Sequence, residues 1–217
     1  MNYHLDGIAY WRRDKDKAIT SWAMLKSKTT AAADSKPAAA VLAASERRRA
    51  PETVALALEV AHAACLDAGR EAKDLPAFFA SSYGDLAVCD AMCSTLAQDP
   101  TLVSPIKFHN SVHNAAVGYW TMATGCMHAS NALAAYEQTF AQALLETVVY
   151  AHAERTACLL VVYDIMPVGA LASVVRQDSN TALALVVSPT KTAQTQWSLS
   201  YRSQTIDAFL EQLIHEC

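Results

Sequence analysis

One cysteine and two histidines near the middle of the chain have the side chains of a nucleophilic site. Cys126 lies two residues before His128, and His113 precedes both in the same stretch. A thiol activated by a neighbouring imidazole forms and breaks thioesters in acyltransferases and thioesterases. One hypothesis is therefore a free-standing acyltransferase or thioesterase-like enzyme that uses Cys126 with His113 or His128.

Two further pairs have the four-residue spacing of metal ligands on a helix. His109 and His113 would share a helical face, but Asn110 stands where a zinc hydrolase carries its glutamate. Cys89 and Cys93 have the same spacing, and no second Cys or His pair completes a tetrahedral site. We therefore expect structural histidines, an apolar helix face at the two cysteines, and neither a metal nor another cofactor.

Length, charge and composition limit the class of protein. The 217 residues are 53% hydrophobic and 18% charged, which predicts a globular protein with one large domain or a small pair of domains. A net charge of −4 gives no basic footprint for nucleic acid, and no apolar run is long enough to span a membrane. Six cysteines without a paired framework, and an N-terminus unlike a signal peptide, favour a cytoplasmic protein with reduced thiols.

Strand and helix patterns alternate along the chain. Strands are predicted at 5–11, 77–81, 156–163 and 182–187, and helices at 51–69, 86–96 and 139–151. A second group of signals follows at the C-terminus, where Trp197, Leu199 and Tyr201 alternate with polar residues as in an edge strand. The last segment, 206–214, has a strongly amphipathic helical pattern whose partner surface is this domain or another chain. This alternation predicts an α/β layered fold.

The central sixty residues carry a series of landmarks in a characteristic order. These are Ser104-Pro105, Asn114, Gly118, Gly125, a strand at 131–136 and a helix at 139–151. In this order and spacing they resemble the N-terminal half of β-ketoacyl synthases, which have the thiolase fold. The resemblance covers about residues 1–190 and implies a single domain over 1–217, a thiolase-like half with a mostly parallel five-stranded sheet flanked by helices. A C-terminal strand and helix are added as an extension at 191–217.

The resemblance also implies that the catalytic residues are missing. Counting to the sharp turn between strand and helix puts Glu137 where the family carries its acyl-accepting cysteine. A carboxylate cannot form the thioester, although it is electrostatically favourable at a helix N-terminus. The family's two catalytic histidines belong to its C-terminal half, and only His215 follows at a place that fits. We therefore expect a pseudo-ketosynthase, in which Glu137 either assists decarboxylation or is structural.

The segment 108–120 resembles the signature of short ketosynthase-like subunits, the chain length factors of aryl polyene type II polyketide synthases. The resemblance implies a non-catalytic subunit that pairs with an active β-ketoacyl-ACP synthase, as a heterodimer or heterotetramer, and shapes its acyl or polyene tunnel. An acyl carrier protein would be reached through that complex. The residues expected at the tunnel or the partner interface are Phe108, His113, Asn114, Tyr119, Trp120, Met122, Asn131, Leu133, Ala135, Tyr136, Glu137 and Phe140.

Three alternatives remain open at this stage. The bulky residues Phe108, Tyr119, Trp120 and Met122 either line a tunnel or form plain core, and the subunit could be a scaffold without tunnel contact. The basic triplet 47–49 is either a solvated helix entrance or a contact for the acidic carrier protein. In the family, the strand at 131–136 pairs with its counterpart across the dimer axis, so an unpaired subunit would expose a strand edge.

Overall fold

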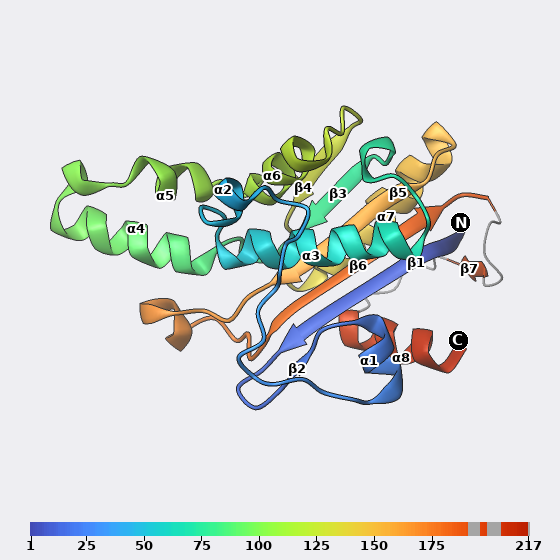
Figure 1. The fold of residues 1–217 in the computed structure, drawn as a ribbon, viewed down its shortest axis with the longest axis horizontal. Helices are drawn as coiled ribbons and strands as arrows, with labels where there is room; N and C mark the ends of the chain where they lie inside the picture. The colour runs from blue at the N-terminus through green and yellow to red at the C-terminus, as the bar shows by residue number, and fades with distance from the viewer. Residues whose placement is uncertain (191–195, 199–204, 217) are drawn as a thin grey trace.

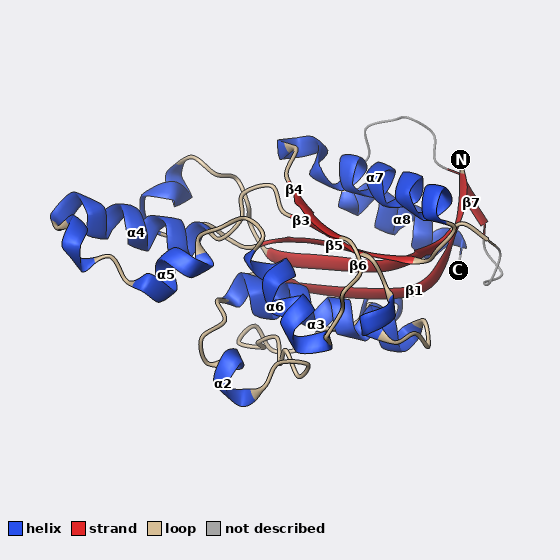
Figure 2. Cartoon of the chain, turned by 90° about the horizontal axis from the view of Figure 1, so that it is seen from above, coloured by secondary structure: helices blue, strands red, loops and turns tan. Residues whose placement is uncertain are grey.

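A single mixed β-sheet with helices on both faces forms the body of the molecule (Figures 1 and 2). The computed structural model describes residues 1–190, 196–198 and 205–216. Its strands are β1 (Asn2–Arg13), β2 (Ala18–Ile19), β3 (Ala77–Ala80), β4 (Ser130–Leu133), β5 (Cys158–Asp164), β6 (Asn180–Ser188) and β7 (Gln196–Ser198). Its helices are α1 (Trp22–Ser27), α2 (Ala44–Arg47), α3 (Glu52–Asp67), α4 (Leu86–Gln98), α5 (Pro105–Asn110), α6 (Ala115–Thr124), α7 (Thr139–Glu154) and α8 (Ile206–Glu216). The predicted α/β fold is confirmed.

The strand order is β2-β1-β6-β5-β3-β4, and β7 pairs with β1. β3 runs parallel to β4 and β5, whereas β6 runs antiparallel to both β5 and β1. Within the five longer strands of this order, β1, β3, β4 and β5 therefore share one direction, as the prediction of a mostly parallel sheet requires.

The structure adds two details to that prediction. Besides β7, which is the added C-terminal strand, the short strand β2 extends the sheet to seven strands, and β6 is the strand that is antiparallel to its neighbours. A parallel neighbour requires a long crossover, usually an α-helix. The segment that joins β5 to β6 contains only the 3-10 helix Gly169–Ser173, so β6 returns beside β5 in the opposite direction.

Helix α3 packs closely against β1 on one face of the sheet. The helix follows Pro51 and ends before Gly69, which has a φ of +63°, so the predicted helix at 51–69 is confirmed. A Cβ atom at Gly7 of β1 would lie 2.3 Å from the Ala64 carbonyl oxygen. Glycine at this position is what allows the helix and the strand to approach so closely.

The opposite face of the sheet is covered by α7 and α8, which lie side by side (Figure 2). The Phe140 and Phe209 rings pack with their centroids 5.1 Å apart, and Leu210 and Leu213 are also buried. The amphipathic C-terminal helix therefore buries its apolar stripe against this same domain. The predicted terminal strand corresponds to β7, while Leu199 and Tyr201 lie outside the described residues.

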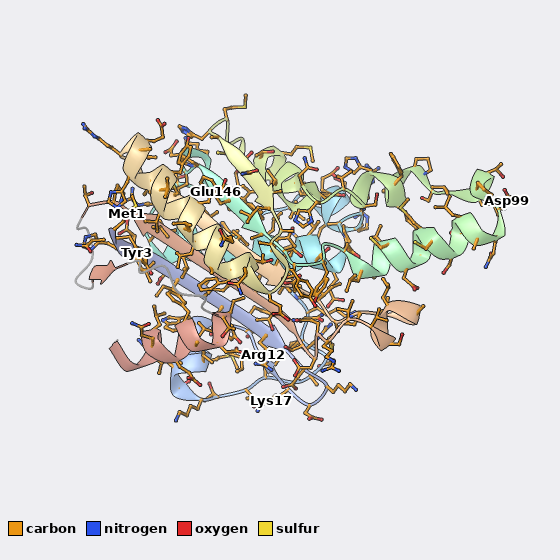
Figure 3. The ribbon with its side chains drawn as sticks, turned by 180° about the vertical axis from the view of Figure 1, so that it is seen from behind. Met1, Tyr3, Arg12, Lys17, Asp99 and Glu146 are labelled. Atoms are coloured by element: carbon orange, nitrogen blue, oxygen red, sulfur yellow. The ribbon has the colours of Figure 1, made fainter. Side chains whose placement is uncertain are left out.

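An arm built from α4 and α5 projects from the body, and Asp99 lies near its tip (Figure 3). Asp85 caps α4 by accepting a hydrogen bond from the Val88 amide, and the Thr53 hydroxyl donates to the same carboxylate. Leu86 is the only buried residue of α4. The predicted apolar face of this helix, which includes Leu96, is therefore not packed into the core. No helix in the described part of the chain is long and apolar enough to cross a membrane.

Candidate functional site at the ends of the parallel strands

A cavity of about 260 Å³ lies at the carboxyl ends of β3 and β5, beside the start of α7. Ligand sites of α/β proteins commonly occupy this edge of the sheet, because the loops that follow the strands converge there. The cavity is lined by polar side chains, among them Arg12, Ser82, Glu137, Asp164 and Asp178, and by parts of Tyr136, Phe140 and Ile206.

Tyr136 forms the sharp turn between β4 and α7. Its φ of +51° is unusual for a residue with a side chain, and such strain persists only where the surroundings hold the backbone in place. Two hydroxyls do so here: Thr139 Oγ1 donates to the Tyr136 carbonyl oxygen at 2.7 Å, and Ser82 Oγ donates to it at 3.1 Å. The turn occurs where the sequence predicts it, but its strained residue is Tyr136, one position before Glu137.

Asp164, the last residue of β5, holds the neighbouring turn after β3. Its carboxylate accepts hydrogen bonds from the Ser81 hydroxyl at 2.7 Å and from the Ser82 and Tyr83 amides at 3.0 and 3.3 Å. Burial raises the pKa of Asp164 above its ordinary value, and these hydrogen bonds oppose that rise. Because Ser82 in turn donates to the Tyr136 carbonyl, Asp164 supports the strained turn through one intermediate residue.

Replacing Asp164 with Asn should remove a pH-dependent part of the stability. A carboxyl whose native pKa is raised binds more protons in the folded state, so its contribution is largest below the unfolded pKa of about 3.9 and declines as pH rises through the native pKa. We expect the free energy of unfolding of the wild type, relative to that of Asp164→Asn, to fall as the pH rises from the unfolded pKa through the native pKa. Urea titrations at a series of pH values measure the difference, and a relative gain in stability with rising pH would contradict it.

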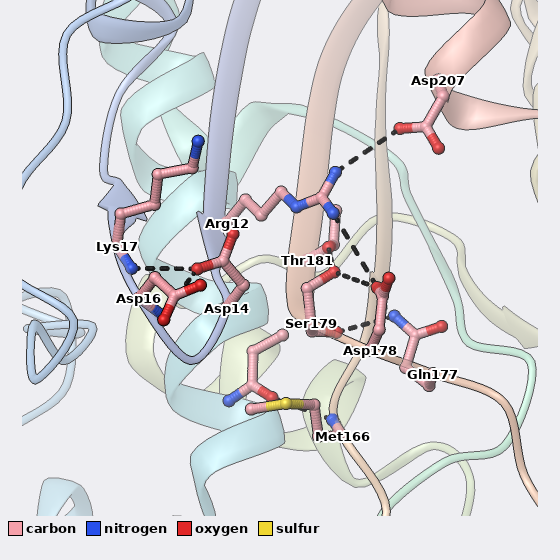
Figure 4. A network of polar contacts seen from close by, with 11 residues as sticks. Arg12, Asp14, Asp16, Lys17, Met166, Gln177, Asp178, Ser179, Thr181 and Asp207 are labelled. Carbon is pink, nitrogen blue, oxygen red and sulfur yellow. Dashed lines mark hydrogen bonds and ion pairs between the residues drawn. The ribbon is translucent and has the colours of Figure 1, made fainter.

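Arg12 is the cation that lines the cavity. It reaches from β1 to Asp178 at 3.8 Å and to Asp207 at the start of α8 at 4.0 Å (Figure 4). Both carboxylates are largely exposed, so each ion pair contributes little stability by itself. Beside it, the Asp14 carboxylate accepts the Asp16 and Lys17 amides, which lowers the pKa of Asp14.

Several residues predicted from the sequence do gather around the turn. His113 Nε2 lies 3.0 Å from the Leu133 carbonyl oxygen at the end of β4, and the Tyr83 and Tyr136 rings meet edge to face with centroids 6.0 Å apart. Ala135 and Glu137 flank Tyr136, and Phe140 is buried one turn later. Asn114, by contrast, is exposed at the start of α6.

Two of the predicted tunnel residues are instead part of the core. Trp120 is fully buried, with its ring 6.2 Å from that of Phe79, and Tyr119 is 3% exposed with its hydroxyl donating to Asn110 Oδ1. The reason is helical geometry, since α6 turns this side towards the sheet. Phe108 and Met122 lie on the outside, with 61% and 64% of their surfaces exposed.

The arrangement expected of a Cys–His enzyme does not form around Cys126. The thiol is buried and donates to the Leu75 carbonyl oxygen at 3.4 Å, whereas His128 is exposed and His113 contacts Leu133. Burial of the thiol in a packed core, bonded to a main-chain carbonyl, is the environment of a structural cysteine.

The predicted pairing of His109 with His113 on one helix is also wrong. Helix α5 ends at Asn110, and His109 instead lies edge-on to the Tyr119 ring, with centroids 6.3 Å apart. Within residues 1–190, 196–198 and 205–216, no cluster of three or more His, Cys, Asp or Glu side chains is arranged to hold a metal ion.

The comparisons with known proteins agree with this architecture. The β-ketoacyl synthase N-terminal domain matches residues 20–213, and the chain therefore belongs to that family. The fold is similar to a chain in the complex of the ketosynthase ApeO with its chain length factor ApeC from Xenorhabdus doucetiae, with a TM-score of 0.75 and 20% identity. That match covers 99% of this chain and 92% of the other.

Two longer chains have the same fold. One belongs to the AntDE:AntF complex, a type II polyketide acyl carrier protein with its ketosynthase (TM-score 0.70, 12% identity, 86% of this chain and 63% of the other). The second belongs to the ishigamide ketosynthase/chain length factor (TM-score 0.65, 13% identity, 89% and 64%). This chain thus spans somewhat less than two thirds of those two. No curated protein sequence matches it.

Sequence reasoning missed Arg12, Ser82, Thr139 and Asp164. A usable signal was present for two of them, because Ser82 and Asp164 directly follow buried apolar strands, where side chains from the carboxyl ends of strands converge. Thr139 and Arg12 carry no such signal. Their roles depend on the path of the turn and on the position of α8.

Proposed function

We propose that this protein is a non-catalytic subunit, similar to a chain length factor, that pairs with an active β-ketoacyl-ACP synthase. The observation that carries the proposal is the outer edge of β4, the last strand of the sheet order, beside the strained turn at Tyr136. Membership of the ketosynthase family and a fold similar to ketosynthase–chain length factor complexes support the same role.

The backbone of β4 is suited to receive a partner strand. Ala77 donates to the Ala129 carbonyl and Ser81 to the Leu133 carbonyl, so alternate residues of this segment face β3 and Ala132 faces outward. In the described part of the chain, no strand pairs with this outer side. An unpaired edge of this kind promotes pairing with another chain.

Asn131 covers part of that edge in the isolated chain. Its Oδ1 accepts the outward Ala132 amide at 2.9 Å, and its Nδ2 donates to Glu146 of α7 at 2.5 Å. A side chain that satisfies an edge amide lowers the tendency of a free edge to aggregate. For a partner strand to bind here, Asn131 has to release this amide.

Exposed apolar side chains also lie on the arm, in the segment after it and on α6. They include Leu96, Leu102, Ile106, Phe108, Val112 and Met122. Exposed apolar side chains are candidates for a protein contact. At the finer level, we propose that Phe108 and Met122 face the acyl or polyene tunnel of the ketosynthase in aryl polyene biosynthesis, with Leu133, Ala135 and Glu137 nearby. Asn114 is proposed to contact the partner directly.

Co-expression with the ketosynthase encoded nearest to the gene, followed by native mass spectrometry, tests the pairing. A complex with equal numbers of the two chains, as a heterodimer or a heterotetramer, is expected. A well-behaved single chain that ignores the ketosynthase would overturn the proposal. The Cys126 enzyme hypothesis then predicts thioester-cleaving activity that is lost in Cys126→Ala.

The basic triplet beside α2 is proposed as a contact for the acidic carrier protein. All three arginines are exposed; Arg47 donates to the Leu42 carbonyl at 2.8 Å, and Arg49 lies 3.9 Å from Glu46. Charge reversal by Arg48→Glu should weaken carrier binding to the complex by about threefold to tenfold, and more at low salt. Titration of a labelled carrier at two salt concentrations measures this, with Lys73→Glu as an exposed control. Equal losses for the two variants would contradict a specific contact.

We further propose a cytoplasmic location and a single domain over 1–217, with a core at about 1–190. The family match at 20–213 and the packing of α8 on the sheet support the second of these.

A further inference from the structure

We infer that Tyr136, and not Glu137, occupies the acyl-acceptor position of this fold, and that the turn around it remains built to hold a nucleophile. The inference rests on the proposed function, because it identifies the residue that stands where an active subunit would carry its acyl-accepting cysteine.

The backbone of the turn singles out Tyr136. A nucleophile elbow is a sharp, strained turn from strand to helix that lifts one side chain above the sheet. Tyr136 alone in this turn has a positive φ, of 51°, and it follows directly on the loop after β4. Its side chain is 62% exposed beside the 260 Å³ cavity, so a reagent can reach this position.

Hydrogen bonds from neighbouring residues hold this strained turn in place. The Tyr136 carbonyl accepts the Ser82 and Thr139 hydroxyls, and Thr139 Oγ1 also accepts the Ala135 amide at 3.0 Å. The Asp164 carboxylate holds Ser82 in place by accepting a hydrogen bond from its amide. None of these contacts involves the phenol ring, so replacing the side chain at 136 leaves all of them in place.

The start of α7 is electrostatically suited to a thiolate. Helix α7 has 16 residues, and the 3-10 turn Tyr136–Gln138 leads directly into its N-terminus. The helix dipole stabilises a thiolate at such a place and lowers the pKa of the thiol. A thiolate introduced at 136 would attack the carbonyl carbon of an acyl thioester and form a new thioester. The bond to the donor sulfur breaks, and the donor leaves as a thiolate that takes a proton from water.

The test installs a thiol at each position in turn. The background carries Cys89→Ser, Cys93→Ser and Cys217→Ser. Cys65, Cys126 and Cys158 are buried and stay, and burial raises the pKa of Cys65 and Cys158 to about 12. Tyr136→Cys and Glu137→Cys are then compared for their rate of reaction with iodoacetamide at pH 7, and for acylation by octanoyl-coenzyme A, read by intact mass. Neither measurement needs the ketosynthase, so the result is independent of whether the two proteins pair.

We expect the thiol at 136 to react about tenfold faster than the thiol at 137 and to be the one that gains the octanoyl group. Equal rates, or a faster reaction and acylation at 137, would overturn the inference. If Tyr136→Cys does not fold, Glu137→Cys still decides the question. Acylation at 137 overturns the inference, and a thiol there that reacts no faster than Cys93 in the unmodified chain supports it.

Discussion

Ala132→Pro is expected to abolish the complex with the ketosynthase while leaving the fold of the isolated chain intact. The outward amide of Ala132 is the donor that a strand on the open side of β4 would use, and proline has no amide hydrogen. Loss of this hydrogen bond, with the ring in the path of the partner strand, should weaken pairing by at least about tenfold. The ladder to β3 uses the alternate residues and is not broken.

Native mass spectrometry of co-expressed proteins and a thermal melt of the single chain measure the two effects separately. Ala132→Ser is the matched control, because it keeps the amide and should leave the complex unchanged. Asn131→Pro removes an amide that faces β3, so it should destabilise the chain itself. A full yield of complex with Ala132→Pro would exclude pairing through this edge.

Trp120→Ala is expected to lower the free energy of unfolding by about 3–5 kcal/mol, the usual cost of deleting a large buried aromatic side chain. Trp120 is fully buried in the core, where its ring packs beside Phe79 of β3. Met122→Ala, on the outer side of the same helix, should change stability by less than about 0.5 kcal/mol. Urea denaturation of both variants measures the difference.

The difference in burial between Trp120 and Met122 determines which variants can test for a tunnel. A change in product length with Trp120→Ala would reflect a damaged fold, so Met122→Ala and Phe108→Ala are the informative variants. An unchanged product with both would favour a scaffold without tunnel contact. A loss of stability for Met122→Ala as large as that for Trp120→Ala would contradict the burial seen in α6.

Local patterns were enough to predict most elements. The strands at 77–81 and 156–163 and the helices at 51–69 and 139–151 were all recognisable, because apolar periodicity and end signals depend on neighbouring residues. The position of the turn after β4 was predictable from the order of landmarks in a known family. Which residue of that turn has a positive φ could not be predicted, because no local pattern reports the Ser82 and Thr139 hydroxyls that hold the Tyr136 carbonyl.

The sequence by itself determined the fold class, the family and the absence of a cysteine at 136 and 137. The tertiary structure decided which side of each element meets the core. It buried Trp120 while leaving Met122 outside, buried the Cys126 thiol against the Leu75 carbonyl, and brought Asp164 to Ser82 across residues far apart in the chain. It also placed the apolar stripe of α8 against α7 of the same domain. The physical reason is that hydrophobic periodicity indicates which face of an element is apolar, whereas the packing of distant elements determines what that face contacts.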